Sequence, residues 1–143
     1  MKILIINGPN LNMLGKREPE IYGSDTLEDI ISDLEDHFPD HEIRHFQSNY
    51  EGELVEIIQE VLDDDVDGLI LNMGAYTHYS YAILDALNMI KIPKIEVHLS
   101  HLYSREEFRH TSVIAPACNG MISGFGKDGY RMAVDWLVRR SKT

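Results

Sequence analysis

The chain has 143 residues, of which 43% are hydrophobic, and this length and composition fit one globular domain spanning residues 1–143. Its formal net charge of −11 speaks against nucleic acid or an anionic membrane as a partner, because both require a basic face. Cys118 is the only cysteine, which excludes a disulfide within the chain and fits a reducing compartment.

No stretch approaches the roughly 20 apolar residues that a membrane helix needs. The apolar run Ile3 to Ile6 is broken by Asn7, so it is shorter than the core of a signal peptide, which has about 7–15 apolar residues. We therefore expect a cytoplasmic protein. Most of the acidic residues fall within Asp25 to Asp40 and Glu51 to Asp67, which we interpret as solvated helix faces.

Short apolar runs alternate with helical patterns along the chain. Strands are predicted at Lys2–Asn7, Glu42–Gln47, Gly68–Asn72, Lys94–Leu99 and Met121–Ser123, the second with the alternation of an edge strand. Apolar stripes at helical spacing predict helices at about residues 27–38, 54–62, 83–90 and 130–138.

Helix boundaries are also visible in the sequence. Thr26 with Asp29 can form a capping box at the start of the first helix, and Pro39 ends that helix. Ser104 with Glu107 predicts a capping box that opens a further short helix.

This alternation predicts an α/β fold, a flavodoxin-like three-layer sandwich with a five-stranded parallel sheet. In such folds the ligand site lies beyond the carboxyl ends of the strands. The segments to inspect are therefore those that follow Asn7, Gln47, Asn72 and Leu99.

The segment after the first strand contains glycine and proline at both ends, which predicts a loop able to close over a site. It has neither a dinucleotide-binding nor a Walker A pattern. Arg17 and Tyr22 lie close together in it, and a cation near a phenol favours the phenolate. Surface packing of Tyr22 is the alternative interpretation.

Strand alternation places Glu96, His98 and Ser100 on one face of the fourth strand. A carboxylate beside a histidine can orient the imidazole and favour its protonated form, as a general acid requires. A structural ion pair is the alternative. The lone His78 after the third strand is more often structural than catalytic.

Arg105 and Arg109 are four residues apart, which predicts one face of the short helix after Ser104. Arginine side chains bind carboxylates through two parallel hydrogen bonds, so the pair is a candidate anion site. Free backbone N–H groups near Ser100 and Ser104 could serve the same anion. Surface salt bridges with Glu106 are the alternative.

Eight segments of the chain, in unbroken order, resemble the type II 3-dehydroquinate dehydratases. They are Asn7-Gly8-Pro9-Asn10-Leu11-Asn12, Arg17-Glu18-Pro19, Tyr22-Gly23, Phe46-Gln47-Ser48-Asn49, Glu51-Gly52, Gly74-Ala75-Tyr76-Thr77-His78, Glu96-Val97-His98-Leu99-Ser100 and Arg105-Glu106-Glu107-Phe108-Arg109-His110. The resemblance implies trimers assembled into a dodecamer and no metal or cofactor. It also implies conversion of 3-dehydroquinate to 3-dehydroshikimate through an enolate, in aromatic amino-acid biosynthesis or in quinate breakdown.

The resemblance further implies a role for each site residue. Tyr22 is the expected base, Arg17 supports its phenolate, Asn10 holds a water against the enolate oxygen, and His98, oriented by Glu96, protonates the leaving hydroxyl. Asp85 is expected to reach a neighbouring subunit's site. The substrate's carboxylate and hydroxyls would be held by Asn72, His78, Arg109 and the backbone N–H groups of Leu99 and Ser100.

Two positions depart from the family pattern: Met73 stands where proline is usual, and His101 where asparagine is usual.

Two other functions stay open. A metal-dependent hydrolase could use His78, His98 and His101 with Glu96, although no HExxH spacing supports it. A non-catalytic flavodoxin-like binding module is also possible, but a phosphate receiver would need acids where Asn7 and Asn72 stand.

Overall fold

The computed structural model of the chain describes residues 1–141. The strands are β1 (Lys2–Asn7), β2 (Glu42–Gln47), β3 (Gly68–Asn72), β4 (Lys94–His98) and β5 (Gly120–Ser123). The α-helices are α1 (Pro19–Tyr22), α2 (Leu27–His37), α3 (Glu51–Glu60), α4 (Tyr81–Asn88) and α5 (Asp128–Arg140). The short 3₁₀ helices are η1 (Leu11–Met13), η2 (Val61–Asp63), η3 (Gly74–His78), η4 (Leu102–Ser104), η5 (Glu107–His110) and η6 (Ala115–Ala117).

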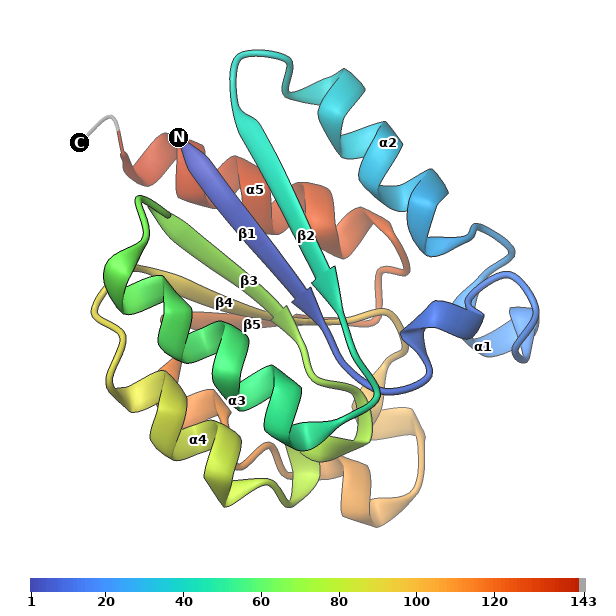
Figure 1. Cartoon of the computed structure of the whole chain (residues 1–143). Coiled ribbons are helices and arrows are strands. Elements are labelled where there is room, and N and C mark those ends of the chain that lie inside the picture. Colours follow the sequence, from blue (N-terminus) through green and yellow to red (C-terminus); the bar gives the residue numbers. More distant parts are fainter. Residues whose placement is uncertain (142–143) are drawn as a thin grey trace.

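The strands form one parallel sheet in the order β2-β1-β3-β4-β5, so the predicted flavodoxin-like fold is confirmed and β2 is the predicted edge strand (Figure 1). Asn7 is in register with Gln47 on one side and with Asn72 on the other. The carboxyl ends of β1, β2 and β3 are therefore level, and the polar segments that follow them meet at one edge of the sheet.

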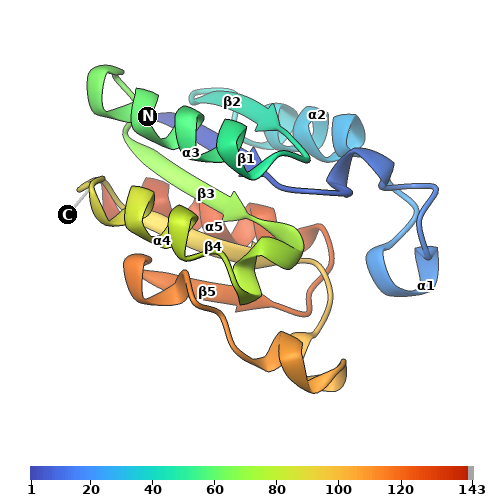
Figure 2. The same cartoon turned by 60° about the horizontal axis from the view of Figure 1, so that its bottom comes forward.

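Helices cover both faces of the sheet, with α2 and α5 on one face and α3 and α4 on the other (Figures 1 and 2). Alternating residues of β1 serve the two cores: Ile3 and Ile5 pack under α2 and α5, whereas Leu4 and Ile6 pack under α3 and α4. Burial on both faces explains the continuous apolar character of β1. Within residues 1–141, no helix has the length and apolarity to cross a membrane.

The predicted capping box of α2 is confirmed. The Thr26 hydroxyl oxygen accepts a hydrogen bond from the Asp29 N–H over 3.1 Å, and the Asp29 carboxylate accepts one from the Thr26 N–H over 3.0 Å. The α2 stripe buries Leu27, Ile30 and Leu34 against the sheet. Local side-chain chemistry thus fixes where this helix begins.

The prediction that a helix begins after a capping box at Ser104 is wrong. Ser104 ends η4 instead, and its hydroxyl donates to the His101 carbonyl of the preceding turn over 2.9 Å. Arg105 then has an extended backbone, with φ −108° and ψ −166°, which separates η4 from η5. Glu107 begins η5 without acting in a capping box.

Two strand limits also differ by one residue from the prediction, since β4 ends at His98 and β5 begins at Gly120. His98 pairs with Ser123 at the end of the ladder, and the Gly124 N–H donates to the His98 carbonyl over 3.3 Å as the chain turns away. Leu99 therefore lies just outside the sheet.

Candidate active site

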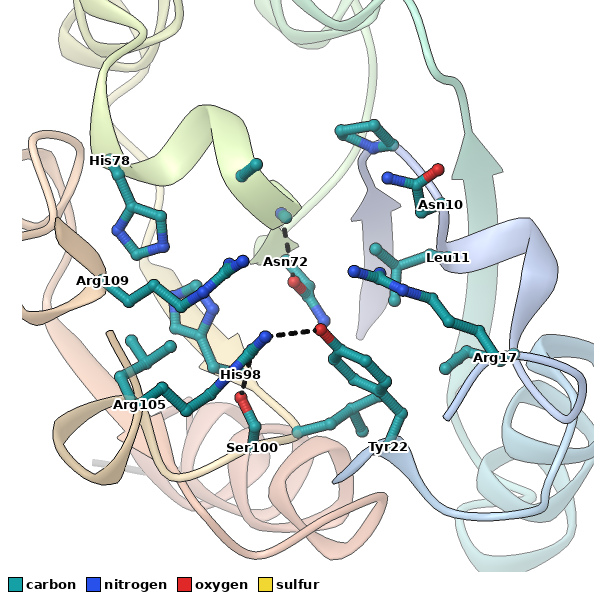
Figure 3. Close-up of a pocket in the computed structure, with 16 residues that line it drawn as sticks. Asn10, Leu11, Arg17, Tyr22, Asn72, His78, His98, Ser100, Arg105 and Arg109 are labelled. Atoms are coloured by element: carbon teal, nitrogen blue, oxygen red, sulfur yellow. Dashed lines mark hydrogen bonds between the residues drawn. The ribbon is translucent and has the colours of Figure 1, made fainter. Parts of the chain in front are cut away.

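A cavity of about 230 Å³ lies at the carboxyl edge of the sheet (Figure 3). All the predicted site residues line it except Glu96 and Asp85. Glu96 is fully buried behind the cavity wall, and Asp85 is exposed on α4. The lining residues are Pro9, Asn10, Leu11, Leu14, Arg17, Tyr22, Asn72, Gly74, Ala75, His78, His98, Leu99, Ser100, Leu102, Arg105 and Arg109.

The cavity is cationic although the chain as a whole is acidic. Arg17, Arg105 and Arg109 line it, and within the described part of the chain no aspartate or glutamate does. Opposite charge attracts an anion most strongly where water is limited. The arrangement therefore suits a small anionic ligand despite the net charge of −11.

Tyr22 lies between two guanidinium groups. The Arg105 Nη2 donates to the Tyr22 hydroxyl oxygen over 2.8 Å, and the guanidinium carbon of Arg17 lies 4.3 Å from the centre of the tyrosine ring. Arg105 also donates through Nη1 to the Ser100 hydroxyl over 3.0 Å (Figure 3). Because a guanidinium only donates, the Tyr22 oxygen is the acceptor in this contact.

Arg105 has a partner that the sequence does not indicate, in addition to the Glu106 carboxylate 3.8 Å from its Nε. The sequence predicts that it shares an anion with Arg109, and gives no sign of a contact to Tyr22, which lies 83 positions away. Arg109 does line the same cavity, with its Nε donating to Glu106 over 3.1 Å. The two arginines thus meet in the cavity without sharing a helix.

The segment that carries Tyr22 has left-handed backbone at both ends of α1. Glu18 precedes the helix with φ 34°, and Gly23 follows it with φ 87°. A glutamate is rarely found in this conformation, whereas glycine adopts it freely. Figure 1 shows α1 projecting from the sandwich, and Arg17 and Tyr22 of this segment line the cavity, so we call residues 17–23 the lid segment.

Asn10 is held by the end of β2. Its N–H donates to the Asn49 side-chain oxygen over 3.0 Å, and Gln47 donates to the same oxygen over 3.2 Å. Gln47 also donates to the Gly8 carbonyl over 3.1 Å. Gln47 and Asn49 fall in one of the recognised segments, but the sequence does not predict that they fix the loop containing Asn10.

The first and third strand ends approach closely. The Gly8 N–H donates to the Asn72 carbonyl over 2.7 Å, and a side chain at Gly8 would stand 2.5 Å from the Met73 carbonyl oxygen. Met73 is fully buried in the core under α3 and α4 with φ −83°, and the Tyr76 N–H closes the turn on its carbonyl. Core packing and this hydrogen bond hold the turn although proline is absent.

Asn72 has its side-chain amide fixed by a buried tyrosine. Its Nδ2 donates to the Tyr130 hydroxyl over 3.1 Å, and its Oδ1 accepts from the Gly74 N–H over 3.2 Å. Tyr130 in turn donates to the Asn7 side-chain oxygen over 2.5 Å. Burial raises the pKa of Tyr130, so its hydroxyl stays protonated and can serve as this donor.

The predicted Glu96–His98 pair is present at the end of β4. The His98 Nε2 lies 2.5 Å from the Glu96 Oε2, and both side chains are buried. The Ser112 hydroxyl donates to the same carboxylate, at 2.9 Å from each oxygen. Ser112 comes from the loop after η5, and no sequence pattern indicates this contact.

His78 lies beside His98, with ring centres 6.4 Å apart and planes inclined by 21°. Its Nδ1 lies 2.9 Å from the Thr111 carbonyl oxygen, which can only accept, so Nδ1 carries a proton. Burial lowers the pKa of His78, the Thr111 contact opposes this, and nearby His98 and Arg109 lower it further. A neutral His78 presents Nε2 as an acceptor.

Within residues 1–141, no group of three or more histidine, cysteine, aspartate or glutamate side chains is arranged to hold a metal ion. His101 does not line the cavity, and its ring lies 6.4 Å from that of Tyr103. The metal-dependent hydrolase alternative therefore receives no support from the geometry.

Comparison with known proteins gives one consistent result. The sequence profile of the family described as dehydroquinase class II matches residues 1–138. The chain is 55% identical over 140 residues to a 3-dehydroquinate dehydratase of Lachnoclostridium phytofermentans, covering 96% of this chain and 97% of that protein. It is 50% identical over 142 residues to that of Thermotoga petrophila, covering 98% and 96%. The crystal structure of a type II dehydroquinase from Butyrivibrio crossotus matches with a TM-score of 0.93 and 51% identity, covering 96% and 97% of the two chains.

Proposed function

The chain belongs to the class II dehydroquinase family and is a hydro-lyase that converts 3-dehydroquinate to 3-dehydroshikimate, and we propose that its own side chains perform this shikimate-pathway reaction without a cofactor. The observation that carries the proposal is the pairing of Tyr22 with Arg105 at 2.8 Å in the same cavity as His98, which Glu96 supports. Tyr22 serves as the base and His98 as the acid.

Tyr22 removes the first proton. A proton beside a ketone is weakly acidic, so the base must be stronger than an ordinary carboxylate. The Tyr22 phenolate takes this proton, the electron pair of the broken C–H bond forms a C=C bond, and the π pair of the C=O bond moves to the ketone oxygen to give an enolate. Arg105 at the phenol oxygen and Arg17 over the ring supply the positive charge that favours the phenolate.

The enolate oxygen is stabilised by a water that Asn10 holds. Asn10 lines the cavity on a loop that Gln47 and Asn49 fix, and it holds the water that donates to the enolate. Donors aimed in advance at developing charge contribute about 3–4 kcal/mol each in sites that exclude water. A closed lid containing Arg17 and Tyr22 would separate the cavity, with the water that Asn10 holds, from bulk solvent.

His98 completes the elimination. As the enolate reforms the ketone, its electrons make the new C=C bond and the C–O bond to the hydroxyl breaks. The protonated His98 imidazole gives its proton to the departing oxygen, which leaves as water. His98 is then neutral and the Tyr22 phenol is protonated, and exchange of protons with solvent restores both groups. Glu96 orients the imidazole through its contact at 2.5 Å.

The remaining groups bind the substrate. The carboxylate is bound by Arg109 and by the backbone N–H groups of Leu99 and Ser100. The ring hydroxyls are bound by Asn72 and His78. The fixed amide of Asn72 and the free acceptor of neutral His78 give each a defined direction for this purpose.

The active oligomer is a trimer, and four trimers form a dodecamer. The protein acts in the cytoplasm. Asp85 is exposed on α4 and does not line its own cavity, and we propose that it completes a neighbour's site in the trimer. The single cysteine fits the reducing cytoplasm.

The test is ultraviolet absorbance during incubation with 3-dehydroquinate, because the product is a conjugated enone that absorbs more strongly than the substrate. We expect the signal to rise with the purified protein alone and to persist in excess EDTA. The absence of any signal from well-folded protein would remove the proposed function.

A further inference from the structure

We infer that Ser112 is a positioning residue for the acid step, because its hydroxyl holds the Glu96 carboxylate that in turn holds His98. This inference rests on the proposed role of His98 as the acid. Ser112 does not line the cavity and so does not touch the substrate.

The contact engages the whole carboxylate. The Ser112 Oγ is 2.9 Å from Glu96 Oε1 and 2.9 Å from Oε2, so the hydroxyl lies across the fork of the two oxygens. Glu96 is 0% exposed, which leaves protein groups as its hydrogen-bond partners. The Glu96 Oε2 contacts the His98 Nε2, and the Glu96 Oε1 accepts a hydrogen bond from the Ser112 hydroxyl.

The direction of the Ser112 hydroxyl is fixed by the backbone. The Ala115 N–H donates to Ser112 Oγ over 3.1 Å at the start of η6. That bond uses the acceptor side of the hydroxyl and leaves its proton for the carboxylate, which can only accept. A chain of contacts thus runs from the η6 turn through Ser112 and Glu96 to His98.

Loss of the hydroxyl would affect the two chemical steps differently. A buried carboxylate oxygen without a donor is unfavourable, so the group would rotate or take up a proton, and in either case His98 would be held less well. The first step would be spared, because Tyr22 is supported by Arg105 and Arg17 and has no contact with this chain of residues. The enolate would still form but would more often return to substrate.

The experiment measures both steps on the same sample in deuterated water. Product formation is followed by absorbance, and exchange of the substrate's α-proton is followed by mass spectrometry of the recovered substrate. For Ser112→Ala we expect product formation to fall about 10- to 100-fold, as for other residues that orient a site through a second group. Exchange is expected to persist, so the ratio of exchange to product rises. Ser112→Thr keeps the hydroxyl and is expected to restore the wild-type ratio.

Two variants calibrate the result. His98→Ala should show the largest ratio of α-proton exchange to product formation. Ser80→Ala is the matched control, because the Ser80 hydroxyl also accepts a backbone N–H, that of Ile83, and also donates to a glutamate, Glu51. It should keep the wild-type ratio. The low-field proton resonance of the His98–Glu96 bond should shift in Ser112→Ala and stay in place in Ser80→Ala.

Each failure has a separate signature. A wild-type protein that forms no product removes the proposed function and this inference with it. A wild-type ratio in His98→Ala removes the acid role and again the inference. With both of these in place, an unchanged ratio in Ser112→Ala, or an equal fall of exchange and product, overturns the role of Ser112.

Discussion

The Arg105 guanidinium donates to the Tyr22 hydroxyl over 2.8 Å, which joins the lid segment near the start of the chain to the loop that follows β4. The same guanidinium donates to the Ser100 hydroxyl over 3.0 Å. The proposed base is thus positioned by a residue of the loop that follows β4, and β4 is the strand that carries the proposed acid, His98.

Arg105→Ala is expected to lower turnover by about 10²- to 10³-fold, the loss typical of removing one preorganised charged donor. The Tyr22 oxygen would lose its donor, while Arg17 and Arg109 would still attract the substrate, so the Michaelis constant should change less than turnover. Steady-state kinetics measures both quantities. Arg131→Ala is the matched control, since Arg131 forms a two-bond pair with Asp33 away from the cavity and its loss should leave turnover unchanged. Equal effects of the two variants would contradict the role of Arg105.

Tyr22→Phe removes only the phenol oxygen and should lower turnover by about 10²- to 10⁴-fold, the usual contribution of general base catalysis. The ring and its contact with Arg17 remain, so a planar enolate mimic should still bind. Titration calorimetry with such a mimic, beside the absorbance assay, separates binding from chemistry. Near-normal turnover would show that another group is the base.

Much of the fold can be predicted from the sequence because the decisive signals are local. The alternation of Ile3 and Ile5 with Leu4 and Ile6 reports a strand buried on both faces, and the capping box at Thr26 marks a helix start. The Glu96–His98 pair is predictable for the same reason, since neighbours two apart on a strand share a face.

The parts that sequence reasoning misses are contacts between loops far apart in the chain. The pairs Arg105–Tyr22 and Ser112–Glu96 depend on how loops pack above the sheet, which no period of two or 3.6 residues encodes. Ser104 shows the opposite failure: its local pattern matches a capping box, but the extended backbone at Arg105 and a bond to His101 prevail.

Lysine chemistry is expected to play no part in turnover. Among residues 1–141 no lysine lines the cavity, and Lys16, which lies in the loop between β1 and Tyr22, is outside it. Lys142 lies outside the described residues. Borohydride added together with substrate should therefore leave activity intact, since it inactivates enzymes that form an imine. Intact-protein mass spectrometry after this treatment would show a covalent substrate adduct if the expectation is wrong.

Cys118 should resist alkylation in the folded protein. Burial raises the pKa of its thiol to about 12, nearby Glu96 adds to the effect, and Lys94 opposes it. The thiolate is the reactive form, so at pH 8 the folded protein should react on the order of a thousandfold more slowly than the unfolded chain. Iodoacetamide labelling with and without denaturant measures this difference. Fast labelling of the native protein would mean that the thiol is open to solvent.

The last prediction concerns Asp85 and the proposed trimer. Asp85 is exposed on α4 and does not line its own cavity, so within one subunit it is a solvated carboxylate. If it completes the neighbouring site, Asp85→Ala and Tyr22→Phe damage different sites in an assembly: the first spoils the neighbour's site and the second spoils its own. Each variant alone should be nearly inactive, and each should still form the same oligomer by size-exclusion chromatography.

Mixing the two variants distinguishes this arrangement from action within one subunit. After co-refolding, some cavities combine an intact Tyr22 with an intact Asp85 from the adjacent chain, and activity should reappear in proportion to their number. For random assembly of equal amounts, about a quarter of the sites regain both groups, because each group is intact in half of the chains. Mass spectrometry should first establish that mixed oligomers are present. Activity that stays at the sum of the two single variants would then mean that Asp85 acts within its own subunit or has no role in the reaction.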